Sequence, residues 1–318
     1  MAALTSCSTE SKAADSGKLE VVTTVAPLTS IISAVGGDRI DLVGLVPEGT
    51  NSHTFEPPPD ASKSLSKADV IFISGLELED PTKELAESTK SPETPIIELG
   101  TQALPESDYI YDFSFPKKDG KPNPHLWTDP TYAITYAHLV RDELIKHDPD
   151  NAAVYQSNDK KFTEQATALS DALRKDQESI PQADRKLLTY HDAYAYFAKT
   201  YDWKVVGAIQ PKNFEDPPPK DITRLIDQVK KENVKAVFGS EVFPSKVLEQ
   251  IGKSTGARYV DVLRDDDLPG DPGDPEHSWL GLMRFDYVTM IEALGGEAPA
   301  LKALDVSQKG ATDATYAK

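Results

Sequence analysis

The sequence contains a single cysteine, Cys7, among 318 residues. One thiol excludes a disulfide framework within the chain and any metal site built from several thiolates. No run of 18 apolar residues occurs, so the sequence predicts no membrane-spanning helix. Positive charge is also scarce: 34 Lys and Arg face 52 Asp and Glu, which leaves a formal net charge of −18. This surplus of negative charge disfavours nucleic acid and anionic membrane surfaces as partners. It is consistent with a cationic ligand, or it serves only to keep the protein soluble.

The length favours two lobes over one. A chain of 318 residues is long for a single hydrophobic core but sufficient for two α/β lobes and a connector. The connector is predicted at 151–179, where neither Gly nor Pro interrupts a helical pattern. Apolar residues recur along one face of this segment: Tyr155, Phe162, Ala166, Leu169 and Leu173. Because charged residues lie largely off that stripe, we expect one long helix with one buried face.

Short apolar segments alternate with helical segments on both sides of the connector. The predicted strands are 19–26, 40–46, 70–74, 95–99, 186–190, 205–209, 235–238 and 259–263. Such alternation is typical of mostly parallel sheets covered by helices. We therefore predict an α/β fold of two lobes, each with a mostly parallel four-stranded sheet flanked by helices, joined by one long backbone helix. The expected boundaries are 1–18 for a tether, 19–148 for the N-terminal lobe, 149–180 for the linking helix and 181–318 for the C-terminal lobe.

Cys7 is the last residue of a short motif at 4–7. Leu4-Thr5-Ser6-Cys7 resembles the lipobox at which bacterial lipoproteins are cleaved before the cysteine receives lipid, and a polar stretch follows it at 8–17. The charged and apolar parts of a secretion signal are missing, so a trimmed leader and a chance match both remain open. We expect an extracytoplasmic protein held at the membrane by a lipid anchor on Cys7.

Three of the six histidines lie where ligands bind in open α/β sheets, at or near the carboxyl ends of predicted strands. His53 is in the loop that leaves the second strand, and His191 directly follows the strand 186–190. His125 precedes Asp129-Pro130, a pair that can cap and begin a helix and thereby hold the histidine on a rigid turn.

Asp261 interrupts the predicted strand 259–263, where a buried carboxylate must find a cation or hydrogen-bond donors. With the three histidines it forms a candidate tetrahedral set of three nitrogens and one oxygen. That set suits Zn2+, and with less preference Mn2+. We assign His138 and His147 to the surface of a helix. His277 is expected in a solvated loop, with a secondary metal contact as the alternative.

Four segments of the chain resemble a known family, the metal-binding receptors of bacterial ABC importers for zinc and manganese. They are Gly-Thr-Asn-Ser-His-Thr-Phe-Glu-Pro at 49–57, Asn-Pro-His-Leu-Trp-Thr-Asp-Pro at 123–130, Thr-Tyr-His-Asp-Ala-Tyr-Ala-Tyr-Phe at 189–197 and Tyr-Val-Asp at 259–261. The resemblance, over about 19–294, implies two lobes joined by a long helix and a metal ion between them. It implies His53 and His125 as ligands from one lobe, and His191 and Asp261 from the other.

The same resemblance implies a partner and a metal. The partner would be the membrane permease of an ABC importer, to which we expect a monomer to deliver its ion. Manganese-selective members usually carry glutamate at the third ligand position, where this sequence has His191, so zinc is favoured and manganese is the alternative. Many zinc members also have a His-rich loop before the second ligand, but 104–121 contains no histidine.

Two functions of other classes stay open at this stage. A zinc hydrolase would need a water position on the metal and a general base, for which Glu241 is the best candidate, but no His-Glu-x-x-His pairing occurs. A receptor for a metal chelate such as a siderophore would need a wide cleft lined by arginine and aromatic residues. The acidic segment 264–276 matches no calcium-loop spacing, so we expect it to be a solvated loop.

Overall fold

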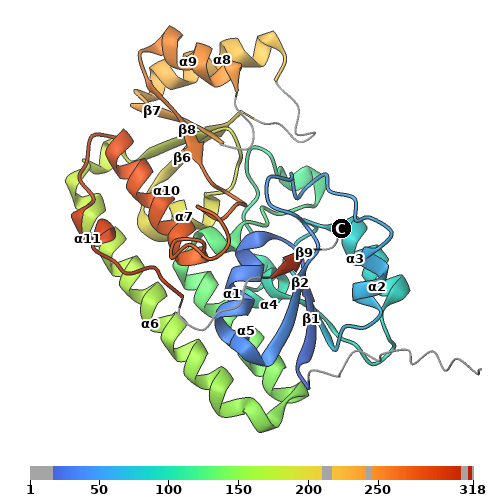
Figure 1. The fold of residues 1–318 in the computed structure, drawn as a ribbon. Helices are drawn as coiled ribbons and strands as arrows, with labels where there is room; N and C mark the ends of the chain where they lie inside the picture. The colour runs from blue at the N-terminus through green and yellow to red at the C-terminus, as the bar shows by residue number, and fades with distance from the viewer. Residues whose placement is uncertain (1–16, 210–216, 241–244, 309–313, 317–318) are drawn as a thin grey trace, which may run out of the picture.

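A computed structural model describes residues 17–209, 217–240, 245–308 and 314–316. Two parallel sheets form two lobes, and one long helix runs beside both of them (Figure 1). The predicted α/β architecture is thus confirmed. The helices in the described part of the chain are all too short or too polar to cross a bilayer.

The N-terminal lobe is built on a five-stranded sheet in the order β4-β3-β1-β2-β9. Its strands are β1 (Leu19–Thr23), β2 (Ile40–Gly44), β3 (Val70–Ile73), β4 (Ile96–Glu98) and β9 (Thr315–Tyr316). All four pairings are parallel. Its helices are α1 (Ala26–Gly36), α2 (Ala61–Leu65), α3 (Asp80–Thr89), α4 (Leu99–Ala103) and α5 (Pro130–His147).

The position of β9 departs from the expected division of the chain. Thr315 and Tyr316 pair with Val43 and Gly44 of β2, so the end of the chain returns to the N-terminal lobe. The first sheet therefore has five strands rather than four. Two residues of a short strand carry no local pattern that would reveal such a distant partner.

The C-terminal lobe contains the predicted four-stranded sheet, in the order β6-β5-β7-β8. Its strands are β5 (Lys186–Thr189), β6 (Lys204–Ala208), β7 (Ala236–Ser240) and β8 (Arg258–Leu263), all parallel. Its helices are α7 (Ala195–Tyr201), α8 (Pro219–Glu232), α9 (Lys246–Thr255), α10 (Trp279–Ala293) and α11 (Pro299–Lys302).

The linking helix is α6 (Ala152–Asp176), followed by one turn of 3₁₀ helix at Gln177–Ser179. The predicted apolar stripe is buried along its whole length, at Tyr155, Phe162, Ala166, Leu169 and Leu173. The helix contacts α1 and α5 of the N-terminal lobe and α10 and α11 of the C-terminal lobe. Asp176 fixes the far end of the helix, because its two oxygens accept hydrogen bonds from the N–H groups of Ala300 and Leu301 (3.2 and 2.8 Å).

The two lobes share a core next to the segment that carries His125. Trp127 donates from Nε1 to the carbonyl of Asp265 (3.1 Å), and Trp279 donates from Nε1 to the carbonyl of Trp127 (2.9 Å). Tyr287 donates its hydroxyl hydrogen to the carbonyl of Thr128 (2.7 Å). Since both tryptophans and Tyr287 are fully buried, the turn between the lobes is fixed in place by packing as well as by hydrogen bonds.

Candidate metal centre

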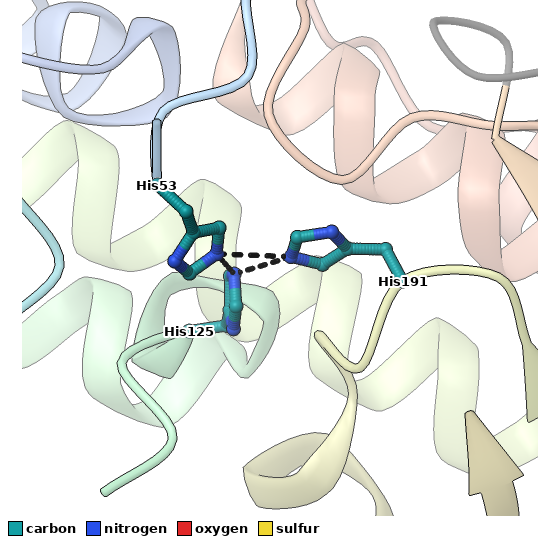
Figure 2. Close-up of side chains that lie close together, drawn as sticks. All are labelled: His53, His125 and His191. Carbon is teal, nitrogen blue, oxygen red and sulfur yellow. Dashed lines mark hydrogen bonds between the residues drawn. The ribbon is translucent and has the colours of Figure 1, made fainter. Parts of the chain in front are cut away.

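Three histidines from distant parts of the chain point their Nε2 atoms at one another (Figure 2). The Nε2 atom of His53 lies 3.1 Å from that of His125 and 3.2 Å from that of His191. The Nε2 atoms of His125 and His191 are 2.8 Å apart. The structure therefore brings together three of the four residues expected from the sequence, at the junction of the lobes.

His53 comes from the loop after β2, at the carboxyl edge of the first sheet. Its backbone N–H donates to the Oδ1 atom of Asn51 (3.0 Å), which shapes the turn that presents the ring. His53 is the most exposed of the three, since His125 is fully buried and His191 is 4% exposed. A cavity of about 270 Å³ adjoins it, with Leu76 and Phe115 in its lining.

One side-chain oxygen of Asn123 contacts both the backbone and the ring of His125. The Oδ1 atom of Asn123 lies 2.9 Å from the Nδ1 atom of His125 and accepts from its backbone N–H (3.0 Å). An amide oxygen can only accept, so Nδ1 carries the hydrogen and Nε2 presents a lone pair to the centre of the cluster. The turn then ends in the predicted cap, in which Asp129 Oδ1 accepts from the N–H of Thr131 (2.9 Å) just after Pro130 begins α5.

His191 directly follows β5, at the carboxyl edge of the second sheet, as the sequence predicts. Its Nδ1 atom lies 3.6 Å from Oδ2 of Asp265. A carboxylate on this side of the ring favours a hydrogen on Nδ1, which leaves the lone pair of Nε2 directed at the centre of the cluster. The neighbouring carbonyl of Asp192 accepts from Asn123 Nδ2 (2.7 Å), so the segments that carry His125 and His191 are bonded to each other.

Burial keeps the rings of His53 and His125 neutral. It lowers the pKa of both well below the ordinary value, and repulsion between a positive charge on either ring and one on His191 lowers both further. Neutral imidazole is the form that binds metal. Tetrahedral zinc with Zn–N distances of about 2.0–2.1 Å would place two ligand nitrogens roughly 3.3 Å apart, which is close to the observed separations.

Asp261 does not join the cluster. Its side chain is exposed on β8, and among the described residues the group of ligand atoms lying within 4.8 Å of one another contains the three histidines alone. The strand ends at Leu263, as predicted, so Asp261 lies inside the strand and not at the carboxyl edge of the sheet, where the site lies. Among the acidic residues that follow the strand, Asp265 lies beside His191.

The start of the acidic segment is buried rather than solvated. Asp265 and Asp267 are 5% and 8% exposed. Asp266 accepts from the hydroxyl of Ser52 through Oδ2 (2.6 Å), and its Oδ1 atom is buried without a hydrogen-bond partner in the part of the chain that the structure describes. Their position directly after a parallel strand was the sequence signal that could have marked these residues.

The remaining histidines are divided between surface and interior. His138 has a 42% exposed side chain and pairs with Asp159 through Nδ1 (2.8 Å), and His147 is partly exposed beside Glu143. The side chain of His277 is only 6% exposed and its Nε2 atom lies 3.3 Å from Glu48 Oε1, so the expected solvated position is wrong. The residue that it contacts lies far away in the sequence, so no local pattern predicted this position. Cys7 and Glu241 lie outside the described residues.

Three imidazole rings that converge between the lobes of a two-sheet α/β protein define a metal-binding protein of the substrate-binding class. The chain belongs to the family described as "Zinc-uptake complex component A periplasmic", whose model matches residues 21–293. The predicted family, a group of metal-binding receptors of ABC importers, is thereby confirmed.

The relatives found carry the names of several metals. The "Iron-binding protein YfeA" of Yersinia pestis is 30% identical over 279 residues, which cover 87% of this chain and 87% of that protein. The "Manganese-binding lipoprotein MntA" of Halalkalibacterium halodurans is 26% identical, covering 88% of this chain and 90% of that protein. Sequence similarity therefore supports binding of a transition metal but does not identify which metal.

Solved structures have the same fold. The periplasmic zinc-binding protein TroA from Treponema pallidum superposes with a TM-score of 0.78 at 22% identity, covering 87% of this chain and 99% of that chain. The manganese-bound periplasmic metal-binding protein from Candidatus Liberibacter asiaticus superposes with a TM-score of 0.76 at 23% identity, covering 86% and 98%. The two-lobed architecture is confirmed by these likenesses.

Proposed function

We propose that this protein captures a zinc ion between its lobes and delivers it to the permease of an ABC importer. The observation that carries the proposal is the convergence of three Nε2 atoms, from His53, His125 and His191, within 3.2 Å of one another. Three imidazole nitrogens that converge on one point can together bind a divalent cation. No common soluble anion or apolar ligand would be recognised by such a set.

The fourth ligand in this proposal is Asp266, in the place expected for Asp261. Its Oδ2 atom is tied to Ser52, the neighbour of His53, and its buried Oδ1 atom has no partner within the described ranges. Burial and the charge of Asp265 raise the pKa of Asp266 to about 6. A carboxylate that is costly to keep charged would be stabilised by a nearby cation. Asp261 offers none of these features, because it is exposed.

Zinc is favoured by the kind of ligand rather than by the relatives. Zinc accepts three nitrogens and one oxygen in a tetrahedron without loss of ligand-field energy. Manganese stands lowest in the Irving–Williams order and gains more from added carboxylate oxygens. Contacts at Nδ1 further support nitrogen ligation, because they orient the Nε2 atoms of two rings toward the centre of the cluster. His125 makes this contact with Asn123, and His191 makes it with Asp265.

The cellular setting follows from the same class. Family membership supports an extracytoplasmic receptor over the zinc hydrolase and the chelate receptor. In our proposal a lipid on Cys7 holds the protein at the outer face of the membrane, the tether 8–17 gives it reach, and a monomer carries one ion to the permease.

A competition titration tests the proposal. Wild-type protein freed of metal is titrated against a zinc indicator and a manganese indicator, beside His125→Ala and the control His138→Ala. We expect one zinc per chain, a strong preference for zinc over manganese, and an unchanged affinity in the control. His125→Ala should lose more than the roughly 10- to 100-fold that loss of an outer partner costs. Equal affinity for both metals would leave manganese as the better assignment, and an unaffected His125→Ala would refute the site.

A further inference from the structure

The loop that carries His53 is fastened to the opposite lobe by two consecutive carboxylates. The backbone N–H of Gly49 donates to both oxygens of Asp267, at 2.8 and 2.9 Å. Ser52 donates to Asp266 (2.6 Å). Gly49 adopts a left-handed conformation with φ of +75°, which turns the chain at the point of attachment. These bonds join a loop after β2 to a loop after β8, more than 200 residues apart.

The other two histidines do not depend on this attachment. His125 is held by Asn123, and the amide of Asn123 bonds to the carbonyl of Asp192 beside His191. Thr128 donates to the carbonyl of Ala193 (2.9 Å), which adds a second bond between the same two segments. His125 and His191 therefore belong to one bonded unit. His53, the most exposed of the three, is placed by its loop.

Asp267 is suited to hold that loop. The side chain is 8% exposed, and both of its oxygens are used by one backbone N–H. A hydrogen bond to a charged acceptor in a buried place is stronger and more directional than one in water. Both oxygens of Asp267 already accept from the Gly49 N–H, whereas Asp266 keeps one oxygen without a partner in the described residues, so the role of Asp267 differs from the direct ligation proposed for Asp266.

We propose that Asp267 is a positioning residue, which keeps His53 at the metal by fastening the 47–56 loop to the second lobe. The inference rests on the proposed function and assigns a role to the acidic segment. When the bond is intact, His53 is close to the other two histidines before the ion arrives. When it is lost, the ion is bound by a ligand on an unattached loop and escapes faster.

The test compares Asp267→Ala with Asp267→Asn and with Asp271→Asn, a control at an exposed position of the same segment. Zinc affinity is measured by competition, and zinc release by stopped flow into excess chelator. We expect release to be about 10-fold faster or more in Asp267→Ala, since a bond to a charged acceptor is lost. Asp267→Asn keeps one acceptor oxygen for Gly49 and should be intermediate. Asp271→Asn should match the wild type.

A double-mutant cycle separates positioning from the attraction of a negative charge for the cation. If Asp267 acts through His53, Asp267→Ala should change zinc release little in a His53→Ala background. An undiminished effect in that background would overturn the inference, because charge acts without His53. So would wild-type release in Asp267→Ala. Failure of the wild type to bind zinc would instead refute the proposed function, so the two failures are distinguishable.

Discussion

The Nε2 atoms of His125 and His191 lie 2.8 Å apart, although 66 positions and the whole of α6 separate the two residues in the sequence. One ring stands at the start of the turn before α5, and the other follows β5 of the second sheet. Asn123 joins their segments by bonding to the Nδ1 side of His125 and to the carbonyl of Asp192. Two nitrogen ligands are thus preorganised, so little ordering is left for the ion to bring about when it binds.

Metal removal should destabilise the protein, because the proposed ligands come from both lobes. An ion that binds only the native state at 100 times its dissociation constant adds about 2.7 kcal/mol to stability. Calorimetry with zinc and then with excess chelator should therefore show a clear fall in Tm. In His125→Ala the two scans should coincide. A Tm of the wild type that does not respond to the chelator would contradict a metal bound between the lobes.

Replacing Asn123 should weaken zinc binding although Asn123 is no ligand. Asn123→Ala removes the acceptor that orients His125 Nδ1, and loss of such an outer partner costs roughly 10- to 100-fold in metal affinity. Asn158→Ala is a matched control, since Asn158 donates to the carbonyl of Val35, away from the histidines. Indicator competition measures both variants. Equal zinc affinities of the two variants would mean that the turn orients the His125 ring without the Asn123 side chain.

The two aspartates on and after β8 should behave differently. Asp266→Ala removes the carboxylate proposed as fourth ligand and should weaken zinc binding, whereas Asp261→Ala changes an exposed position and should leave the affinity unchanged. Titration of both variants against the same indicator decides between them. The opposite result would restore Asp261 as the ligand.

The positions of the three histidines could be predicted from the sequence, whereas the position of the fourth proposed ligand could not. The histidines could be placed because each follows or precedes an element whose end is marked in the sequence, and the carboxyl ends of parallel strands gather at one edge. The end of β8 at Leu263 was predicted as well, and Asp261 lies inside that strand, two residues before its carboxyl end. Asp261 was expected in the site because a buried carboxylate in a strand needs a cation, but its side chain is exposed. The carboxylate beside His191 is Asp265, which follows the strand.

Other features depended on contacts that no local pattern contains. The apolar stripe of α6 was predictable, because one buried face repeats with the helical period. The buried ring of His277 contacts Glu48, which lies more than 200 residues earlier. The pairing of β9 with β2 likewise joins the two ends of the described chain. Such contacts between distant parts of the sequence exist only in the folded chain, so the sequence alone does not predict them.

Stability should also depend on pH through Glu79, a buried carboxyl apart from the histidines. Its Oε1 atom accepts from the Thr24 hydroxyl and from the Ser74 N–H (both 2.7 Å), while Oε2 is buried without a partner in the described residues. Burial raises the pKa of Glu79 from 4.5 to about 7. The folded state therefore holds this proton more tightly than the unfolded state. The stability it contributes is complete below about pH 4.5 and is lost as the pH rises through 7.

Glu79→Gln mimics the neutral acid and removes this dependence. Because one pKa unit corresponds to about 1.36 kcal/mol, the variant should gain roughly 2 to 3 kcal/mol relative to the wild type between pH 5 and pH 8. Urea unfolding of both proteins without metal at each pH measures the difference. Glu84→Gln, at an exposed position of α3, should show none. A constant difference between Glu79→Gln and the wild type would mean that Glu79 does not titrate in this range.

Anomalous diffraction at the zinc absorption edge, from crystals of the zinc-loaded protein, tests the central claim most directly. The account predicts one ion about 2.0–2.1 Å from the Nε2 atoms of His53, His125 and His191, with a carboxylate oxygen of Asp266 as the fourth ligand. An ion that lies away from these three nitrogens, or no ion between the lobes, would contradict it.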